Sequence, residues 1–411
     1  MKLSRRSLMG AGTAALALPA AGAARAAPRP KIKIGVLVDM SGPYRDDTGP
    51  TSVVCTKQAA QDFGASHVGF DIEVIAGDHQ NKPDVGAAIA RQWYDREGVD
   101  CIVDVPNSAV GLAVSTVTRE KNKVFLDSGS GVSLLFGKDC SPNTVDWTYD
   151  TWMLAHSTGG QMVKQGGDSW YFITADYVFG HILESDTTAL IKAAGGKVLG
   201  SVRYPFPETT DFSSFLLQAA SSGAKVLGFA NAGGDTQNCI KQAHEFGLGK
   251  KMRIAALLIE SNDIRAIGLE TAQGIYYTES YYWDANPSTR AWNARVSKTT
   301  PDHAYPNQGQ AGDYGATLHY LKAVAALGAK AAQADGRGVV ARMKAMPTDD
   351  PCFGKGSIRL DGRALHPVYL LQAKTPQESK SSWDVARIAH ITPADQAWRP
   401  MNEGDCPLVK S

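Results

Sequence analysis

Strand-like and helix-like segments alternate along most of the chain, and this alternation restricts it to an α/β fold. Apolar runs typical of buried strands occupy residues 31–40, 70–78, 99–107 and 122–130. Segments with apolar residues at helical spacing separate them, as in KPDVGAAIARQWYDRE. Strands this apolar, each followed by a helix, are typical of a parallel sheet that is covered on both faces.

The same alternation starts a second time further along the chain. Strand-like runs recur at 169–177, 224–232, 252–260 and 273–283, again with helix-like segments between them. The switch between the two series falls near Thr148–His156. We therefore predict two doubly wound parallel-sheet lobes.

The length of the chain agrees with two lobes, since about 385 residues exceed what one core usually organises. We assign residues 28–151 plus 285–343 to the first lobe and residues 152–284 plus 344–405 to the second. Near the end, SIRLDGRALHPVYLLQAKT predicts a hairpin that turns at Asp361-Gly362. Ligands of open α/β sheets bind beyond the carboxyl ends of the strands, so we expect a site in the crevice between the lobes.

The first 26 residues have the layout of a secretory signal peptide. A basic start precedes an apolar stretch rich in Ala and Leu, and Ala24-Arg25-Ala26 forms an A-x-A site that predicts cleavage after Ala26. Ser4–Met9 also resembles the twin-arginine export signal. A membrane anchor is the alternative, but the apolar stretch is shorter than the ~20 residues of a span. We expect an exported, periplasmic protein that is not inserted in the membrane.

The charge balance argues against binding to nucleic acid or to an anionic membrane. Residues 1–26 contain four basic residues and no acidic one, so their removal takes the formal charge from +1 to −3. A slightly acidic protein has no electrostatic attraction for polyanions. No nucleic-acid partner is expected.

Six cysteines remain outside the predicted signal peptide. None forms C-x-x-C or stands at metal-ligand spacing with a histidine, so no metal site is expected. In an oxidising compartment an even number indicates disulfides, and six cysteines allow fifteen connectivities. Cys55, on the first predicted helix, and Cys101, at the start of the third strand, are our one predicted pair. Free, buried cysteines throughout are the alternative.

The motifs of the common enzyme classes are absent from the sequence. Ser130 is not in a G-x-S-x-G elbow, because Ser128 stands where the first glycine should be. Neither a phosphate-binding G-x-x-x-x-G-K-[ST] nor a dinucleotide-binding G-x-G-x-x-G after the first strand is present. Adjacent acids such as Asp46-Asp47 and Asp349-Asp350 are typical of solvated turns. We expect neither catalysis nor a cofactor.

The stretch VFLDSGSGVSLLFG joins a strand to a helix-like segment through Ser128-Gly129-Ser130-Gly131. Hydroxyl groups and glycines at such a turn suit a bound ligand, because glycine lets the ligand approach the backbone closely. A plain helix N-cap by serine is the alternative interpretation.

The ordered set of segments resembles a known family. DMSGPY (39–44), VPNSAVGLAV (105–114), VFLDSGSG (124–131) and ITADYVFG (173–180) follow an export signal. This is the running order of periplasmic solute-binding proteins of ABC importers, of the branched-chain amino acid type. The resemblance extends to CFGKGSIRLDGRALHPVYLLQAKTP (352–376) and implies a type I periplasmic binding protein fold. It implies two lobes joined by a three-strand hinge, which close on a small solute and dock on a permease.

The resemblance also implies where the ligand binds. The turns at Asn107-Ser108 and Ser128–Ser130 should hold the ligand's carboxylate through hydroxyls and N–H groups at helix N-termini. Phe179 stands where relatives commonly carry a tyrosine that reaches the ligand. Glu260 is the nearest candidate for the acid that pairs an amino acid's ammonium group, with a helix-start acid as the alternative.

Aromatic residues hint at the nature of the ligand. Tyr276, Tyr277, Tyr281, Tyr282 and Trp283 cluster at the end of a strand expected to rim the cleft, and such a rim would suit a flat carboxylate. Arg45 could pair a carboxylate bidentately, or be a solvated loop charge. The full predicted ligand-binding set is Tyr44, Arg45, Asn107, Ser108, Ser128, Gly129, Ser130, Tyr177, Phe179, Asn231, Glu260 and Tyr281.

The sequence thus predicts the extracytoplasmic receptor of an ABC importer, a monomer that captures an amino acid or a related small carboxylate. Its partners would be the permease and ATPase of the importer. A receptor for aromatic carboxylates is the first alternative. A ligand sensor of the same fold for a membrane kinase or chemoreceptor is the second. An enzyme would be revealed by turnover of a candidate solute.

Overall fold

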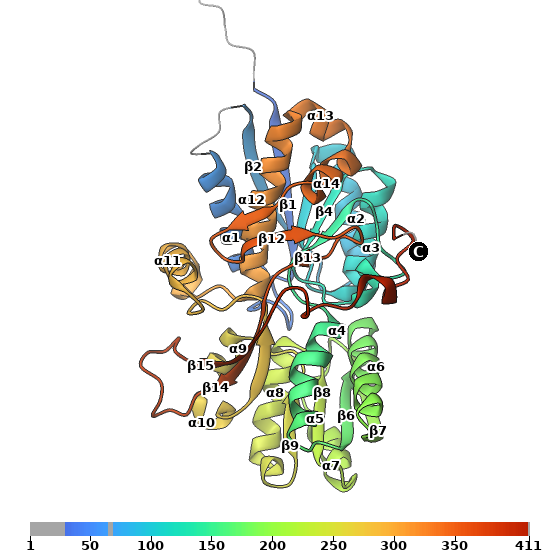
Figure 1. Cartoon of the computed structure of the whole chain (residues 1–411), viewed down its shortest axis with the longest axis vertical. Coiled ribbons are helices and arrows are strands. Elements are labelled where there is room, and N and C mark those ends of the chain that lie inside the picture. The colour runs from blue at the N-terminus through green and yellow to red at the C-terminus, as the bar shows by residue number, and fades with distance from the viewer. Residues whose placement is uncertain (1–28, 65–68, 410–411) are drawn as a thin grey trace, which may run out of the picture.

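The computed structural model describes residues 29–64 and 69–409. The chain forms two lobes that lie one above the other in Figure 1. Each lobe is built on a parallel sheet, so the predicted fold of two doubly wound lobes is confirmed. The predicted signal peptide lies outside the described residues.

The first lobe holds a five-stranded parallel sheet in the order β2-β1-β3-β4-β5. Its strands are β1 (Lys31–Val38), β2 (Asp71–Asp78), β3 (Cys101–Asp104), β4 (Val124–Asp127) and β5 (Thr144–Asp146). Its helices are α1 (Gly49–Gly64), α2 (Pro83–Gln92), α3 (Ser108–Glu120), α11 (Pro287–Val296), α12 (Gln308–Leu327), α13 (Ala329–Ala334) and α14 (Gly336–Lys344). The central strands β3 and β4 are buried at every position, which is why their sequences are apolar up to the aspartate that ends each strand.

The second lobe repeats the plan with four parallel strands in the order β7-β6-β8-β9. These are β6 (Ser169–Ala175), β7 (Lys197–Tyr204), β8 (Val226–Ala230) and β9 (Arg253–Ala256). The helices are α4 (Thr151–Leu154), α5 (Gly160–Lys164), α6 (Val178–Ala193), α7 (Ser213–Ser221), α8 (Gly233–Glu245), α9 (Ser261–Ile267) and α10 (Leu269–Ala272). An antiparallel sheet, β10-β14-β15, lies beside them, with β10 (Tyr276–Glu279), β14 (Val368–Ala373) and β15 (Ala386–Thr392).

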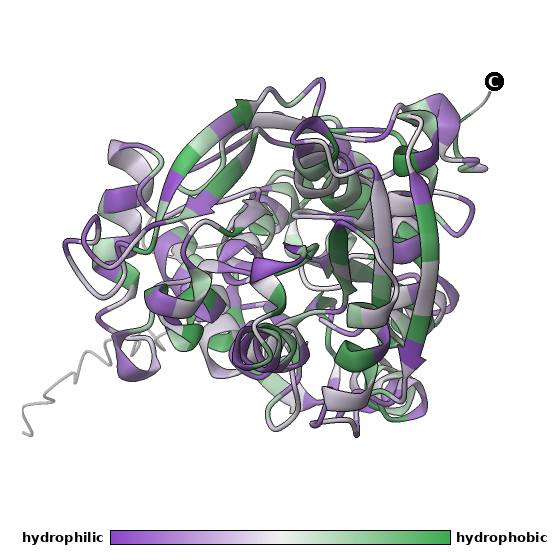
Figure 2. Ribbon diagram, turned by 90° about the horizontal axis from the view of Figure 1, so that it is seen from below, coloured by the Kyte–Doolittle hydropathy of each residue, from purple (hydrophilic) through white to green (hydrophobic). Residues whose placement is uncertain are grey.

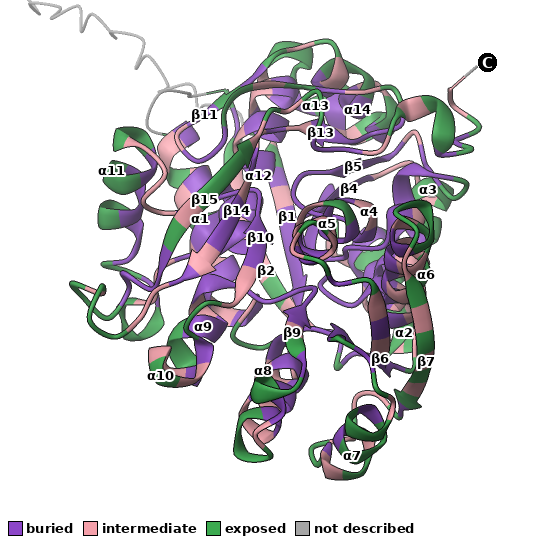
Figure 3. Ribbon diagram, turned by 60° about the horizontal axis from the view of Figure 1, so that its bottom comes forward, coloured by how far each residue is buried: buried purple, intermediate pink, exposed green. Residues whose placement is uncertain are grey.

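Burial follows the layers of each lobe. The strands β3, β4 and β8 are buried at every position, whereas the edge strands β2 and β7 and the outer face of α7 are partly exposed (Figure 3). Around the outer helices hydrophobic and hydrophilic residues alternate, as Figure 2 shows. α12 differs, because it packs between α1 and α14 and is buried along most of its length. The amphipathic pattern of the outer helices therefore indicates which of their faces are exposed and which pack on the sheets.

Three segments connect the lobes: β5 to α4, β10 to α11, and β13 to β14. The predicted hairpin forms, with Ile358 on β12 (Gly354–Ile358) opposite Ala364 on β13 (Ala364–Leu365) and Gly362 in the left-handed region at φ 97°. Its second strand breaks beside Pro367, and β14 continues in the other lobe. Proline has no N–H to donate to a sheet ladder, which is consistent with a break there.

Residues 348–365, which we assigned to the second lobe, lie on the first. β11 (Thr348–Asp350), β12 and β13 form a small antiparallel sheet. Cys352, Phe353 and Ile358 pack into the same core as Ile32 of β1. The hairpin pattern identified these strands but carried no information about which lobe they cover.

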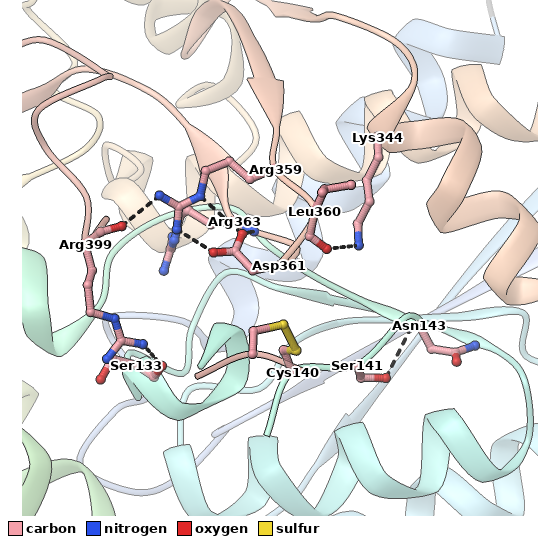
Figure 4. The surroundings of a disulfide bond; sticks show 11 residues. Ser133, Cys140, Ser141, Asn143, Lys344, Arg359, Leu360, Asp361, Arg363 and Arg399 are labelled. Carbon is pink, nitrogen blue, oxygen red and sulfur yellow. Dashed lines mark hydrogen bonds and ion pairs between the residues drawn. A yellow bond between two sulfur atoms is a disulfide. The ribbon is translucent and has the colours of Figure 1, made fainter. Parts of the chain in front are cut away.

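The predicted Cys55–Cys101 disulfide is wrong. Cys55 and Cys101 lie in the same core of the first lobe, but the two thiols do not pair, and both are buried and free. The disulfide joins Cys140, in the loop before β5, to Cys406 in the C-terminal segment (Figure 4). The bridge closes a separation of 266 residues.

The C-terminal segment returns to the first lobe beside the hinge. Arg399 donates to the carbonyl of Ser133 at 3.0 Å (Figure 4). Arg363 is fully buried and pairs with Asp146 and Asp150 at 2.6 and 3.0 Å. The rings of Phe136 and Trp398 lie 4.0 and 4.4 Å from its guanidinium. Arg363 therefore holds both ends of the segment from β5 to α4, one of the three that connect the lobes.

Candidate functional site: an acidic, aromatic cavity between the lobes

A narrow cavity lies between the two lobes, and part of it is open to solvent. Its walls come from loops at the carboxyl ends of the parallel strands, where ligands of such folds bind. It is lined by Tyr44, Asp47, Thr48, Pro106, Ser128, Gly129, Tyr149, Tyr177, Phe179, Ala232, Gly233, Leu258, Glu260, Asp263 and Gly309.

Aromatic rings from both lobes form one side of the cavity. Tyr44 lies in the loop after β1, and Tyr177 lies at the N-terminus of α6. Their hydroxyl oxygens are 2.5 Å apart and form a hydrogen bond across the cleft. Phe206 stacks on Tyr177 with ring centroids 4.4 Å apart. Tyr149 donates its hydroxyl to the carbonyl of Gly129 at 2.6 Å. With Phe179, these rings give a surface suited to an apolar or aromatic group of a ligand.

Carboxyl groups also line the cavity. Glu260 is 4 % exposed and begins α9, where its N–H donates to Asp263 at 2.9 Å. Gln308 donates to Glu260 Oε1 at 3.2 Å, whereas Glu260 Oε2 is buried and accepts no hydrogen bond. Burial, and then the nearby Asp47 carboxylate, raise the pKa of Glu260 well above its usual range.

The serine turn is engaged within its own lobe. The Ser130 N–H and Oγ both donate to Asp127, at 2.8 and 2.5 Å, and Ser128 Oγ donates to Asp313. Burial raises the pKa of Asp127 and of Asp313 to about 7. Ser128 and Gly129 still border the cavity with their backbone. A side chain at Gly129 would collide with Asp104 and Pro106, so only glycine fits there.

The structure brings together half of the predicted ligand-binding set. Residues that line the cavity are Tyr44, Ser128, Gly129, Tyr177, Phe179 and Glu260. Asn107 caps α3 by accepting from the N–H groups of Ala109 and Val110, and the neighbouring Ser108 is buried. Asn231 accepts from Thr236 at 2.7 Å inside the second lobe.

Three further predicted residues lie away from the cavity. Ser130 faces Asp127, as described. Arg45 is exposed and pairs with Asp46 at 2.7 Å. Tyr281 packs in the core of the first lobe against Trp292, and the predicted aromatic rim from that segment is not part of the cavity. Strand alternation and the turn after β10 direct these rings into the cores of the two lobes.

The prediction missed several cavity residues. Asp47 was interpreted as a solvated turn acid, yet it lines the cavity and accepts from Asn262 of the other lobe at 2.7 Å. Asp263 and Tyr149 were not singled out. Asp263 stands three residues after Glu260, the spacing of a capping box, and this signal could have marked α9 as beginning at Glu260.

Within the described residues, no group of His, Cys, Asp and Glu side chains is arranged to hold a metal ion. The helices of that part of the chain include none long and apolar enough to cross a membrane.

Two parallel α/β lobes with a polar and aromatic cavity between them define a two-lobed solute-binding protein. The family model described as periplasmic binding protein matches residues 31–380. The chain belongs to this family, as its resemblance predicted.

Solved structures agree with that assignment. The chain is 46 % identical to a periplasmic binding protein from Burkholderia mallei, with a TM-score of 0.88, over 92 % of this chain and 99 % of that one. It is 34 % identical to a branched chain amino acid ABC transporter periplasmic ligand-binding protein from Burkholderia xenovorans, with a TM-score of 0.79 and the same coverage. A solute-binding protein from R. palustris in complex with benzoate, 20 % identical over 89 % and 97 % of the chains, has a TM-score of 0.78 and shares the fold. No curated protein matches the chain.

Proposed function

We propose that this protein is the receptor of an ABC importer and that its solute is an amino acid, held between the lobes and released unaltered. The observation that carries the choice of solute is Glu260 Oε2, a buried carboxylate oxygen without a hydrogen-bond partner at the cavity. A buried carboxylate oxygen without a hydrogen-bond partner is costly, and an ammonium group would satisfy it.

The lining of the cavity supports an amino acid over a plain aromatic acid. None of the lining residues is Lys, Arg or His, and three are acidic. An isolated carboxylate would enter a field of like charge, whereas the ammonium group of an amino acid offsets it. Tyr44, Tyr149, Tyr177 and Phe179 would pack against an apolar or aromatic side chain.

The ligand's carboxylate would face the Ser128-Gly129 turn and the N-terminus of α8. α8 begins at Gly233, which lines the cavity, and its N-cap residue Ala232 makes no side-chain capping bond. A helix N-terminus favours an anion through its N–H groups and dipole. The two ends of a zwitterion would thus be held by different features of the cleft.

Thermal-shift measurements on the purified protein test this proposal. Ligands that bind the native state raise the melting temperature by mass action. The panel holds the common L-amino acids, benzoate, 4-hydroxybenzoate and, for each responding amino acid, the carboxylic acid without its amino group. We expect one class of amino acid to respond and its deaminated partner to fail. A response to benzoates alone would overturn the proposal in favour of an aromatic-acid receptor.

The importer and the export route are part of the same proposal. The kinship with the Burkholderia xenovorans transporter protein supports an importer with a permease and an ATPase. We expect the receptor to be a monomer without enzymatic activity. Deletion of the gene should abolish high-affinity uptake of the labelled solute. If uptake stays normal but the cells lose their signalling response to the solute, the protein is a sensor instead. The twin-arginine-like leader supports export to the periplasm, and Edman sequencing of the exported protein should begin at Ala27.

A further inference from the structure

Carboxyl groups from the two lobes meet at the cavity. Asp47 belongs to the loop between β1 and α1 of the first lobe, and Glu260 and Asp263 belong to the start of α9 in the second. Asn262 donates its amide to Asp47 at 2.7 Å across the cleft. The Asp47 and Asp263 carboxyls line the same cavity, and each affects the pKa of the other. These acids are therefore brought together by contact between the lobes.

Other titratable groups around them are acids or phenols. Asp46 adjoins Asp47, Glu279 lies behind Glu260, and Tyr149 faces both acids. Tyr44 and Tyr177 complete the aromatic side. The neighbouring cation, Arg45, is 53 % exposed and pairs with Asp46 outside the cavity. None of the cavity-lining side chains is basic, so the cluster is not neutralised from within its walls.

Contact between the lobes is consequently costly when the acids are ionised. Burial first, and then mutual repulsion, raise the pKa of Asp47 well above its usual range. Burial also raises the pKa of Asp263 to about 6. A proton can relieve this repulsion, and so can a positively charged ligand. Glu260 Oε2, unpaired and 96 % buried with its residue at the cavity, marks the place where such a cation would bind.

We propose that Asp47 is a specificity-determining residue, which keeps the empty lobes apart by repelling Glu260 and Asp263 and lets them close on a solute that carries an ammonium group. This inference rests on the proposed function and deepens it. Glu260 provides the direct partner of the ammonium. Asp47 makes closure itself depend on the positive charge, so that a neutral or anionic solute of the same shape cannot close the lobes.

The sign of the pH dependence follows from the raised pKa values. Solvated carboxyls in separated lobes titrate near about 4, and the same groups in contact titrate higher. Protonation therefore favours closure of the empty protein. This effect is fully present below about pH 4 and, for Asp263, is lost as the pH rises through about 6; the pKa values of Asp47 and Glu260 are raised in the same direction.

Small-angle X-ray scattering of the ligand-free protein tests the inference, with Asp47→Asn as the variant. Asparagine keeps a carbonyl that can accept from Asn262 and removes the charge. The matched control is Asp46→Asn, because Asp46 is 71 % exposed, pairs with Arg45 and does not line the cavity. Both variants remove one negative charge from the same loop, and circular dichroism verifies that each is folded.

At about pH 8, where solvated carboxyls are ionised, we expect the wild type and Asp46→Asn to be open. Asp47→Asn should shift toward closed, with a change of about tenfold in the closed-to-open ratio. The wild type should become more compact as the pH is lowered to about 5. Equal scattering of Asp47→Asn and Asp46→Asn, or a wild type unaffected by pH, would overturn the role of Asp47. Other buried acids, such as Asp127 and Asp313, also titrate in the pH series. If Asp47→Asn fails to fold, Asp47→Ser, which also removes the charge, therefore replaces it in the comparison with Asp46→Asn.

The inference and the proposed function fail in different ways. In the first case L-phenylalanine or L-leucine binds, but Asp47→Asn neither closes nor gains affinity for the deaminated partners, 3-phenylpropionate and 4-methylpentanoate. The proposed role of Asp47 is then wrong, and the receptor assignment stands. If Asp47→Asn closes the empty protein but no amino acid binds, the repulsion is real and the amino-acid assignment is wrong.

Discussion

The hydroxyl oxygens of Tyr44 and Tyr177 lie 2.5 Å apart and join the two lobes at the edge of the cavity. Tyr44 comes from the loop after β1 and Tyr177 from the N-terminus of α6, and Phe206 stacks on both rings. The bond forms only when the lobes are in contact. It therefore contributes to the closed state and to the affinity for any solute that closure traps.

Tyr44→Phe removes this bond and keeps both rings. We expect solute affinity to fall by roughly fivefold, since one such bond contributes about 1 kcal/mol. Tyr177→Phe should have the same effect, and the double variant little more, because both remove one interaction. Calorimetric titration measures the affinities. Additive losses in the double variant would show that each hydroxyl contacts the solute separately.

Ser130→Ala should lower stability rather than affinity. Its hydroxyl donates to buried Asp127, and its loss removes one of two hydrogen bonds to that carboxyl. We expect a loss of about 1 kcal/mol in the free energy of unfolding, measured by urea denaturation without solute. Normal stability with a large loss of affinity would instead show that Ser130 turns into the cavity to hold the ligand.

Glu260→Gln keeps the shape of the side chain and removes its charge. We expect amino-acid affinity to fall by about tenfold or more, because a charge-assisted bond to a buried carboxylate is lost. Affinity for the deaminated partner should not fall. The control is Glu279→Gln, because the Glu279 carboxyl accepts from Ser261 behind the cavity. It shows how far the loss of a nearby buried carboxyl disturbs the fold without a direct contact to the solute. Equal losses in the two variants would contradict direct contact between Glu260 and the ammonium group.

Cys406→Ser opens the bridge to Cys140, which closes a separation of 266 residues. Disulfides that close long loops stabilise mainly by restricting the unfolded chain, so we expect a loss of roughly 2–5 kcal/mol in unfolding free energy. Cys140→Ser and the double variant should lose as much as Cys406→Ser. A larger loss in the double variant would show that the two side chains also stabilise the fold independently.

The fold could be predicted because its signal is local and repeated. Buried strands such as 124–127 begin with an apolar run, here Val-Phe-Leu, and each strand of the two parallel sheets is followed by a helix. The lobe assignment of residues 348–365 and the Cys140–Cys406 bridge depend on contacts distant in sequence. The local pattern of apolar residues gives no information about contacts between residues that are distant in sequence.

The site residues also fall into those that local sequence could predict and those that depend on distant contacts. Glu260 and the Ser128-Gly129 turn lie at strand ends, where position in the fold indicates function. Asp47 resembled a solvated turn acid because its burial arises only when the second lobe lies against the first. The hydroxyls of Ser128 and Ser130 were expected to face a ligand, but buried acids of their own lobe compete for them.

The location of the solute's amino group tests the central claim most directly. A crystal structure of the protein with the responding amino acid bound would show it. We predict the ammonium nitrogen within about 3 Å of Glu260 Oε2, the usual length of such a bond, and the side chain against Tyr177 and Phe179. A solute whose carboxylate or apolar end faces Glu260, or one bound outside the cleft, would contradict the account.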